Sequence, residues 1–273
     1  MRWQTYVALG VVSLALASAG CGGSSLGASD TSSTPTNASA AGIWSGTDSA
    51  SGLTLQAFIN SAGQADFIRA DGVQYVGTVQ VSGSTLVVSV GGYANFGTAF
   101  SGGSTSYGIG TFDGTVSTST SISGTLSFTP TGGSVETSTW TLDFQSSLYN
   151  TASSLDAIAG SYTSGTAFVG GVDPMSSASV TISSGGVIFG QGSSSGCVLS
   201  GSLTVGNSSY DIYEVSYTLS SCTGTYVNLN GVQFTGLAVL NTNTTPTQVV
   251  IAVTGQAASD GTYYGLVTAL TAS

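Results

Sequence analysis

Apolar and polar residues alternate in short runs along most of the chain from Gly42 onward. The runs are rich in Val, Ile, Thr, Phe and Tyr, and Gly, Asn and Ser separate them, which is the pattern of half-buried strands joined by turns. The clearest are LTLQAFI, VQYVGTVQV, STLVVSV, ISGTLSF, TWTLDF, ASVTI, YDIYEVSYTL, VQFTGLAVL and QVVIAV. Only TASSLDAIAG, at residues 151–160, suits one or two helical turns. The pattern predicts an all-β fold, an antiparallel barrel or sandwich.

A recurring motif places an aromatic residue between two glycines, in the form G-x-aromatic-x-G. It surrounds Trp44, Phe112 and Tyr263, and an approximate copy surrounds Phe234. Because alternate residues of a strand share a face, each ring of the full motif has a glycine on either side of it. A missing side chain beside a ring lets the strand coil sharply, and the ring covers the gap. The motif therefore indicates small, tightly curved sheets.

The two halves of the body begin alike, with AGIWSGT at 41–47 and AGSYTSGT at 159–166. Each half is long enough for a meander of about eight strands that closes into a small barrel. We therefore predict two β modules, at 42–150 and 157–273, joined through a short segment and related by an internal duplication. The alternative is one continuous sandwich, in which the similar openings arise by chance in a sequence of low complexity.

Two cysteines, Cys197 and Cys222, lie in the second half. In a chain that leaves the reducing cytoplasm we expect them to form a structural disulfide. A metal site at these cysteines would need further ligands such as His, and the chain has no His. We therefore predict neither a metal nor any other cofactor.

The segments around these cysteines suggest a hairpin that turns at residues 206–209. If Val205 faces Tyr210 in that hairpin, Cys197 faces Thr218 and Cys222 lies beyond its partner. Either the turn is longer than four residues or the disulfide joins the strand ends after a bulge.

Charge narrows the range of partners. The chain has 273 residues, of which 2 are Lys or Arg and 12 are Asp or Glu, and its formal net charge is −10. Arg2 lies in the leader, so Arg69 is the only cationic side chain of the body. Binding to nucleic acids or to anionic lipid surfaces depends on Lys and Arg, so we expect neither as an electrostatic partner. The 41% of hydrophobic residues still allows a core to form.

The N-terminus carries two processing signals. MRWQTY is followed by the apolar run VALGVVSLALA, which is too short for a lasting transmembrane helix and is typical of a secretory signal peptide over residues 1–20. Ala17-Ser18-Ala19 is a site for ordinary cleavage, which would release a soluble secreted chain beginning at Gly20. Ser18-Ala19-Gly20-Cys21 instead resembles the lipobox of bacterial lipoproteins, with Ser18 where Leu is commonest.

The lipoprotein resemblance, confined to about the first 25 residues, implies acylation of Cys21 by chains such as palmitate, which together hold a protein durably at a membrane. Gly22 in the next position would favour the outer membrane in a Gram-negative cell. Residues 21–41 would be a lipidated cysteine followed by a flexible Gly/Ser/Thr linker. We therefore expect an extracytoplasmic protein attached to the outer membrane, with secretion of a soluble chain as the alternative.

The residues that most often carry catalysis are missing. Without His or Lys there is no Ser-His-Asp triad, Ser-Lys dyad or Schiff base. Paired carboxylates are the remaining route to hydrolysis, and the pairs closest in sequence are Asp66 with Asp71 and Asp211 with Glu214. We interpret these as solvated acids of turns and surfaces, and we expect no enzyme, with a glycoside hydrolase as an alternative.

Two further acids precede glycines, in Asp113-Gly114 and Asp260-Gly261. They lack both the spaced oxygen ligands of a calcium loop and the residue order of an aspartic protease. We interpret them as turn or bulge residues.

Aromatic residues are the better candidates for binding. Tyr213 and Tyr217 fall on one face of a predicted strand and Tyr210 on the other, while Tyr263 and Tyr264 point opposite ways. Exposed tyrosines suit contact with carbohydrate or protein, because they offer a large area with a polar tip. The candidates are Tyr210, Tyr213, Tyr217 and Tyr264, in a surface-binding or structural protein. The alternative is a lipocalin-like barrel that carries a small apolar ligand.

Overall fold

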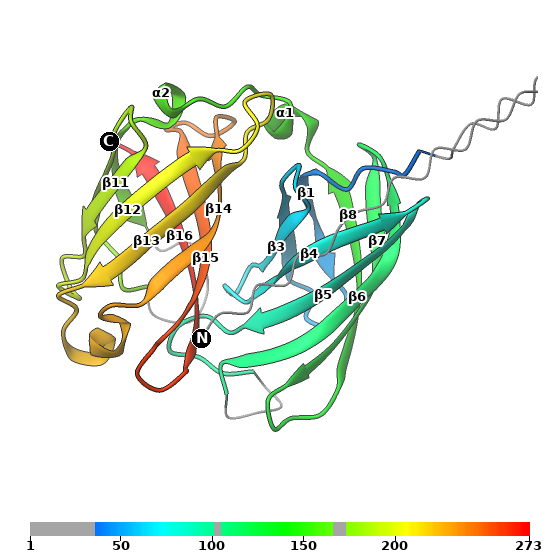
Figure 1. The fold of residues 1–273 in the computed structure, drawn as a ribbon, viewed down its shortest axis with the longest axis horizontal. Helices are drawn as coiled ribbons and strands as arrows, with labels where there is room; N and C mark the ends of the chain where they lie inside the picture. Colours follow the sequence, from blue (N-terminus) through cyan, green and yellow to red (C-terminus); the bar gives the residue numbers. More distant parts are fainter. Residues whose placement is uncertain (1–35, 101–104, 166–172) are drawn as a thin grey trace, which may run out of the picture. The chain divides into compact units, whose positions relative to one another are not determined.

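The computed structural model describes residues 36–100, 105–165 and 173–273 (Figure 1). The predicted signal peptide, the lipidation site Cys21 and the linker up to residue 35 lie outside them. The last residues of the predicted flexible linker are bound to the first half. Ala38 N–H donates to the Gly83 carbonyl (2.7 Å), and the Asn37 side chain accepts from Gly83 N–H (2.8 Å). Residues 37 and 38 are therefore attached to the first half ahead of its first strand.

The first half is a closed barrel of eight antiparallel strands, each paired with the next in the chain. Its strands are β1 (Gly42–Asp48), β2 (Thr54–Ile59), β3 (Gln64–Arg69), β4 (Gln74–Ser82), β5 (Thr85–Tyr93), β6 (Tyr107–Ser117), β7 (Ser121–Pro130) and β8 (Glu136–Phe144). β1 closes the barrel on β8, with Trp44 opposite Phe144 and Asp48 opposite Trp140.

The second half repeats this topology with eight strands of its own. They are β9 (Gly160–Gly165), β10 (Ser179–Ile182), β11 (Val187–Gln191), β12 (Val198–Val205), β13 (Tyr213–Ser220), β14 (Gln233–Asn241), β15 (Gln248–Gln256) and β16 (Tyr263–Ala272). β16 pairs with β9 to close the barrel. The predicted all-β class with two small barrel modules is confirmed, and the single sandwich is wrong because each sheet closes on itself.

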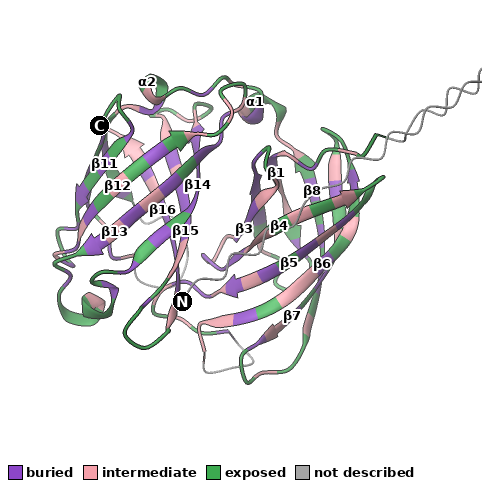
Figure 2. Ribbon diagram, in the orientation of Figure 1, coloured by how far each residue is buried: buried purple, intermediate pink, exposed green. Residues whose placement is uncertain are grey.

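Each barrel has a core of inward-facing side chains, and Figure 2 shows buried and exposed residues alternating along many strands. In β8, Ser138, Trp140 and Leu142 are buried while their neighbours in the strand are more exposed. Trp140 lies at the centre of an aromatic cluster, with ring centroids 4.9 Å from Phe112 and 5.2 Å from Phe67. An eight-stranded barrel is just wide enough to be filled in this way.

A third apolar cluster, which we call the junction cluster, joins the two barrels. Its members are Ile43, Phe58, Ile68, Tyr149, Ile212, Leu237, Val239, Ala252 and Val267. Those that lie in strands face outward from their own barrels, since their neighbours along the strands occupy the two barrel cores, while Tyr149 and Ile212 come from connections between strands. Strands at the junction are therefore buried on both faces, and the two barrels share one apolar interface.

The connection between the barrels contains two single helical turns, α1 (Ser146–Tyr149) and α2 (Leu155–Ile158). The short helix predicted at 151–160 corresponds to α2, which Ser154 caps by accepting from Ala157 N–H (3.0 Å). Among the described residues, no helix has the length and apolar character needed to cross a membrane.

The glycine–aromatic motif acts as its spacing predicted around Trp44. A Cβ on Gly42 would lie 2.7 Å from the Trp44 indole nitrogen, so the ring covers that glycine. Gly46 has a different role, because a Cβ there would lie 1.8 Å from the Thr141 carbonyl oxygen of β8. The motif therefore permits both the ring packing and the close approach of strands at the barrel seam.

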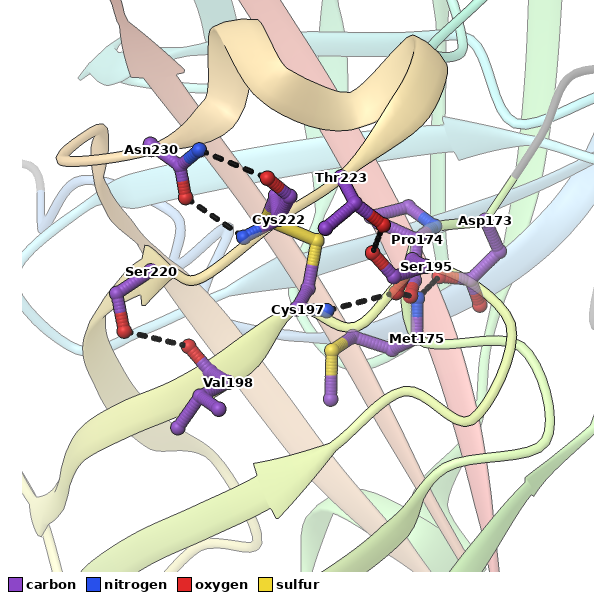
Figure 3. The surroundings of a disulfide bond; sticks show 10 residues. All are labelled: Asp173, Pro174, Met175, Ser195, Cys197, Val198, Ser220, Cys222, Thr223 and Asn230. Carbon is purple, nitrogen blue, oxygen red and sulfur yellow. Dashed lines mark hydrogen bonds between the residues drawn. A yellow bond between two sulfur atoms is a disulfide. The ribbon is translucent and has the colours of Figure 1, made fainter.

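The hairpin of the second barrel has a longer turn than four residues. Val205 pairs with Tyr213 and Val198 with Ser220, so residues 206–212 form the turn and the register with Tyr210 opposite Val205 is wrong. The register leaves Cys197 and Cys222 just beyond the paired strand ends, where the predicted disulfide forms (Figure 3). Asn230 holds Cys222 by accepting from its N–H (2.7 Å) and donating to its carbonyl (3.0 Å).

Candidate binding groove at the barrel junction

Two adjacent hollows that share Glu214 lie where the β2–β3 turn meets the second barrel. The smaller, of about 70 Å³, is lined by Asn60, Ser61, Ala62, Tyr149, Gly206, Asn207, Tyr210, Ile212 and Glu214. The larger, of about 260 Å³, is lined by Gln64, Ser202, Thr204, Glu214, Val215, Ser216, Thr235 and Gly236. We call the two together the junction groove.

Asn60 fixes the polar centre of the groove. Its side-chain oxygen accepts from the backbone N–H groups of Ala62 and Gln64, each at 3.0 Å, which orients the amide. The Nδ2 atom then lies 3.4 Å from the side-chain oxygens of both Gln64 and Glu214. Both amide hydrogens thus have acceptors in the protein, but these contacts are long for hydrogen bonds, so a ligand oxygen can compete for them.

Glu214 supplies the carboxylate of the groove. It is exposed on β13 because the flanking Tyr213 and Val215 face the core and alternate residues point outward. Gly206 lies against it, and a Cβ at that position would stand 3.0 Å from the Oε1 atom. The carboxylate is therefore held between the first barrel and its own turn, and neither ion pair of the described residues involves it.

Two stacked tyrosines form the aromatic wall. The Tyr149 and Tyr210 rings lie 4.3 Å apart with an interplanar angle of 7°. Tyr149 is buried in the junction cluster, where burial raises the pKa of its hydroxyl to about 12, while Tyr210 stays partly exposed. The Asp211 N–H also donates to the Tyr149 carbonyl (3.2 Å), which ties the 206–212 turn to α1.

The structure brings only one of the four predicted binding tyrosines to this surface. Tyr210 lines the groove. Tyr213, Tyr217 and Tyr264 are 0%, 3% and 7% exposed and belong to the core of the second barrel, so their proposed surface exposure is wrong. The period of the strand correctly put Tyr213 and Tyr217 on one face, but that face is the inner one.

The acids considered as catalytic pairs have different environments. Asp71 lies in a turn, as predicted, and forms an ion pair with Arg69 (2.8 Å). Asp66 and Asp211 are each 1% exposed, so describing them as solvated is wrong. Desolvation raises the pKa of Asp66 to about 8 and that of Asp211 to about 7. Among the described residues, no hydrogen-bond donor reaches either carboxyl oxygen of Asp66.

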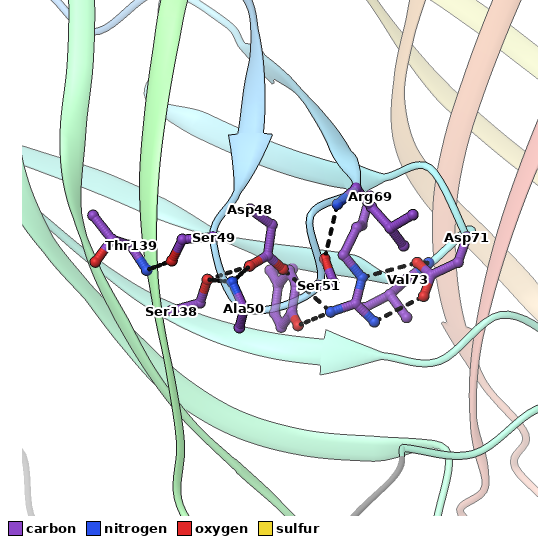
Figure 4. A network of polar contacts seen from close by, with 11 residues as sticks. Asp48, Ser49, Ala50, Ser51, Arg69, Asp71, Val73, Ser138 and Thr139 are labelled. Carbon is purple, nitrogen blue, oxygen red and sulfur yellow. Dashed lines mark hydrogen bonds and ion pairs between the residues drawn. The ribbon is translucent and has the colours of Figure 1, made fainter.

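Arg69 is the centre of a separate polar network that the sequence did not predict (Figure 4). It contacts Asp71 through Nε and Nη2 (2.9 and 2.8 Å) and Asp48 through Nη1 (3.3 Å). Burial acts to raise the pKa of Asp48, but hydrogen bonds from Ser138 and Ala50 and the charge of Arg69 leave that pKa below its ordinary value. Arg69 is therefore ion-paired with two acids of the first barrel, Asp48 and Asp71.

The two Asp-Gly pairs differ. Asp260 lies in a turn, as predicted, where its carboxylate accepts from Thr262 N–H (2.9 Å) and Gly261 has a φ of +74°. Asp113 is instead an exposed residue inside β6, paired with Val87 and Thr125, so its interpretation as a turn or bulge residue is wrong.

A second aromatic group crosses the barrels and was missed from the sequence. The Tyr107 and Tyr263 rings stack at 3.9 Å, and Tyr93 meets them edge-on at 5.3 and 6.0 Å. Ser106 donates to the Tyr263 carbonyl beside them (3.0 Å). None of these three rings lines the junction groove, so we assign them to the contact between the barrels and not to the ligand site.

The fold and the groove define the chain as a tandem of eight-stranded up-and-down barrels with a polar and aromatic surface site. Within the described residues, no group of three or more cysteine and carboxylate side chains is placed to hold a metal ion. No family model, curated protein or solved structure matches the chain.

Proposed function

We propose that the protein is a lipid-anchored, non-enzymatic binding protein of the bacterial outer membrane, and that it binds its partner in the junction groove. The observation that carries the proposal is the meeting of a partly exposed ring, Tyr210, with the amide of Asn60 and the carboxylate of Glu214. Ligand sites combine concave shape and apolar surface with a few convergent polar groups. The lipobox-like sequence around Cys21 supports the anchor.

The chemistry of the groove favours binding over hydrolysis. Glycosidases use two carboxyl groups on either side of the bond that they cleave, and Glu214 is the only carboxyl among the residues that line the groove. Asp211 is its neighbour in sequence, but its side chain is buried. One exposed carboxylate can accept hydrogen bonds from a ligand without providing an acid–base pair.

Packing inside the first barrel is a reason to prefer the groove to a lipocalin-like internal site. Trp140 contacts the rings of Phe67, Phe112 and Tyr75, with centroids 4.9 to 5.3 Å apart. A ligand in the centre of this barrel would have to displace these rings.

The anchor is tested by the intact mass of protein from the membrane fraction, with a Cys21→Ser variant as control. We expect a chain that begins at a multiply acylated Cys21, and loss of that mass and of membrane attachment in the variant. A soluble chain that begins at Gly20 would contradict the anchor.

The groove is tested by amide hydrogen exchange of the full chain, with and without an extract of Gram-negative cell envelope. We expect slower exchange at residues 60–64 and 206–216 in the extract, and unchanged exchange in β6, which lies in the first barrel away from the groove lining. Equal exchange throughout would contradict the groove as a binding site.

A further inference from the structure

We propose that the junction groove binds neutral carbohydrate, with a sugar ring in the larger hollow, hydroxyl groups bonded to Glu214, and a substituent of the ring between Asn60 and Tyr210 in the smaller hollow. This inference rests on the proposed function, because it names the ligand of the same site.

The groove offers hydrogen-bond donors and acceptors in nearly equal supply. Its larger hollow is lined by hydroxyl side chains that can both donate and accept, namely Ser202, Thr204, Ser216 and Thr235. Asn60 adds an amide donor, and Glu214 adds two acceptor oxygens. Sugar hydroxyls also donate and accept at the same atom, so this lining complements a ring that carries several hydroxyls.

Charge argues for a neutral ligand. No cationic side chain lines the groove, so a phosphate, sulfate or uronate would meet Glu214 without compensation. A metal ion or a polyamine would find only one carboxylate in the groove, that of Glu214, and would also face the amide hydrogens of Asn60. A carboxylate that accepts from adjacent hydroxyls avoids both problems, because hydrogen bonds to a charged acceptor are strong and require no opposite charge.

The aromatic wall and the volume set the shape of the ligand. Tyr210 stacks on Tyr149, which lines the same smaller hollow, so its ring is held in place before a ligand arrives. The larger hollow, of about 260 Å³, lies just below the usual range for small-molecule sites. The larger hollow therefore suits one sugar ring, and the smaller, of about 70 Å³, has room only for a substituent of that ring beside Tyr210.

Calorimetric titration of the full chain with cellotetraose, maltotetraose and tetra-N-acetylchitotetraose tests this inference. We expect at least one to bind, with affinity about tenfold weaker in Glu214→Gln, because a hydrogen bond to a charged acceptor is replaced by a neutral one. Asp113→Asn removes the same charge from an exposed strand of the first barrel and should leave the affinity unchanged. Tyr210→Ala should also weaken binding. If circular dichroism shows that Tyr210→Ala is unfolded, the affinity of Glu214→Gln alone tests the inference.

Several results would overturn the inference. Binding of none of the three sugars would do so, as would sugar binding that Glu214→Gln leaves intact. Binding of spermidine but no sugar would assign the groove to cations. If envelope extract still slows exchange at residues 60–64 and 206–216 while the sugars fail, the binding function stands and only the ligand class is wrong. If neither has an effect, the proposed function fails as well.

Discussion

Asn60 of the first barrel donates to Glu214 of the second, with 3.4 Å between Nδ2 and Oε1, although 154 positions separate them in sequence. Gln74 makes a similar link by donating to the Val253 carbonyl (3.3 Å). Both are contacts between the two barrels, and the first lies in the lining of the junction groove. A site built from two barrels can keep its shape only while the junction is intact.

The junction predicts that the barrels stay together after the connection is cut. A specific protease sequence inserted after Ala152 should allow complete cleavage into two fragments that co-elute in size-exclusion chromatography without denaturant. The physical reason is that separation would expose the junction cluster, including Phe58, Ile68 and Leu237, to water. Fragments that separate in buffer would contradict the shared interface and favour the predicted modules 42–150 and 157–273 as independent domains.

Gly46 at the barrel seam should not tolerate a side chain. We expect Gly46→Ala to lower the free energy of unfolding by about 1–3 kcal/mol, because its Cβ would meet the Thr141 carbonyl and force β1 away from β8. Gly165→Ala is the control, since a Cβ there meets no atom of the described residues within 4 Å. Urea unfolding of both variants measures the difference, and equal stabilities would show that the seam relaxes freely.

Cys197 and Cys222 close a loop with a sequence separation of 25 residues. Replacing both with serine should cost about 3 kcal/mol of stability, because the unfolded chain regains the freedom that the loop removed. Thermal unfolding with and without reductant provides the comparison. Reductant should destabilise the native protein and leave the double variant unchanged. If the native protein unfolds at the same temperature after its disulfide has been fully reduced, the disulfide does not make this contribution to stability.

Stability should fall as pH rises from about 4 to about 8. Burial raises the pKa of Asp66 from 3.8 to about 8, so between these values the folded protein holds a proton that the unfolded chain releases. The unfolded state therefore binds fewer protons, and the free energy of unfolding falls by at most about 1.4 kcal/mol per pH unit for this group. Asp211 also makes the free energy of unfolding fall as pH rises, up to its raised pKa of about 7.

Asp66→Asn tests this dependence because it resembles the protonated acid and cannot ionise. Urea midpoints at pH 4.5, 6 and 7.5 should decline less steeply in the variant, and the variant should be the more stable protein at pH 7.5. The exposed Asp113→Asn should leave the slope as it is in the native protein. A native slope that rises with pH over this range would disprove the raised pKa.

The architecture could be predicted because period-two alternation records which face of a strand is buried, and each half contains enough strands to close. The junction could not be found by the same rule. Its signal was a break in the alternation, in Ala57-Phe58-Ile59 of β2 and Leu237-Ala-Val-Leu240 of β14, where consecutive residues are buried. Such runs mark strands covered on both faces.

The candidate site was predictable only in part, for the same physical reason. Alternation separates the two faces of a strand but does not identify the inner one, so Tyr213 and Tyr217 looked as suitable for binding as Tyr210. The contact of Asn60 with Glu214 depends on how two barrels pack, which neither local pattern nor composition encodes. Asp66 was likewise assigned to a solvated turn or surface, because acidic residues are almost never fully buried unless paired.

The pairing of Arg69 has a consequence for digestion by trypsin. The chain has 2 Lys or Arg residues in all, Arg2 and Arg69. Its side chain is 17% exposed, lies at the end of β3 and is ion-paired on both sides. Trypsin and related proteases cut after basic residues in accessible segments. The folded molecule therefore offers them almost no site to cut. Even the unfolded body would give only two long fragments.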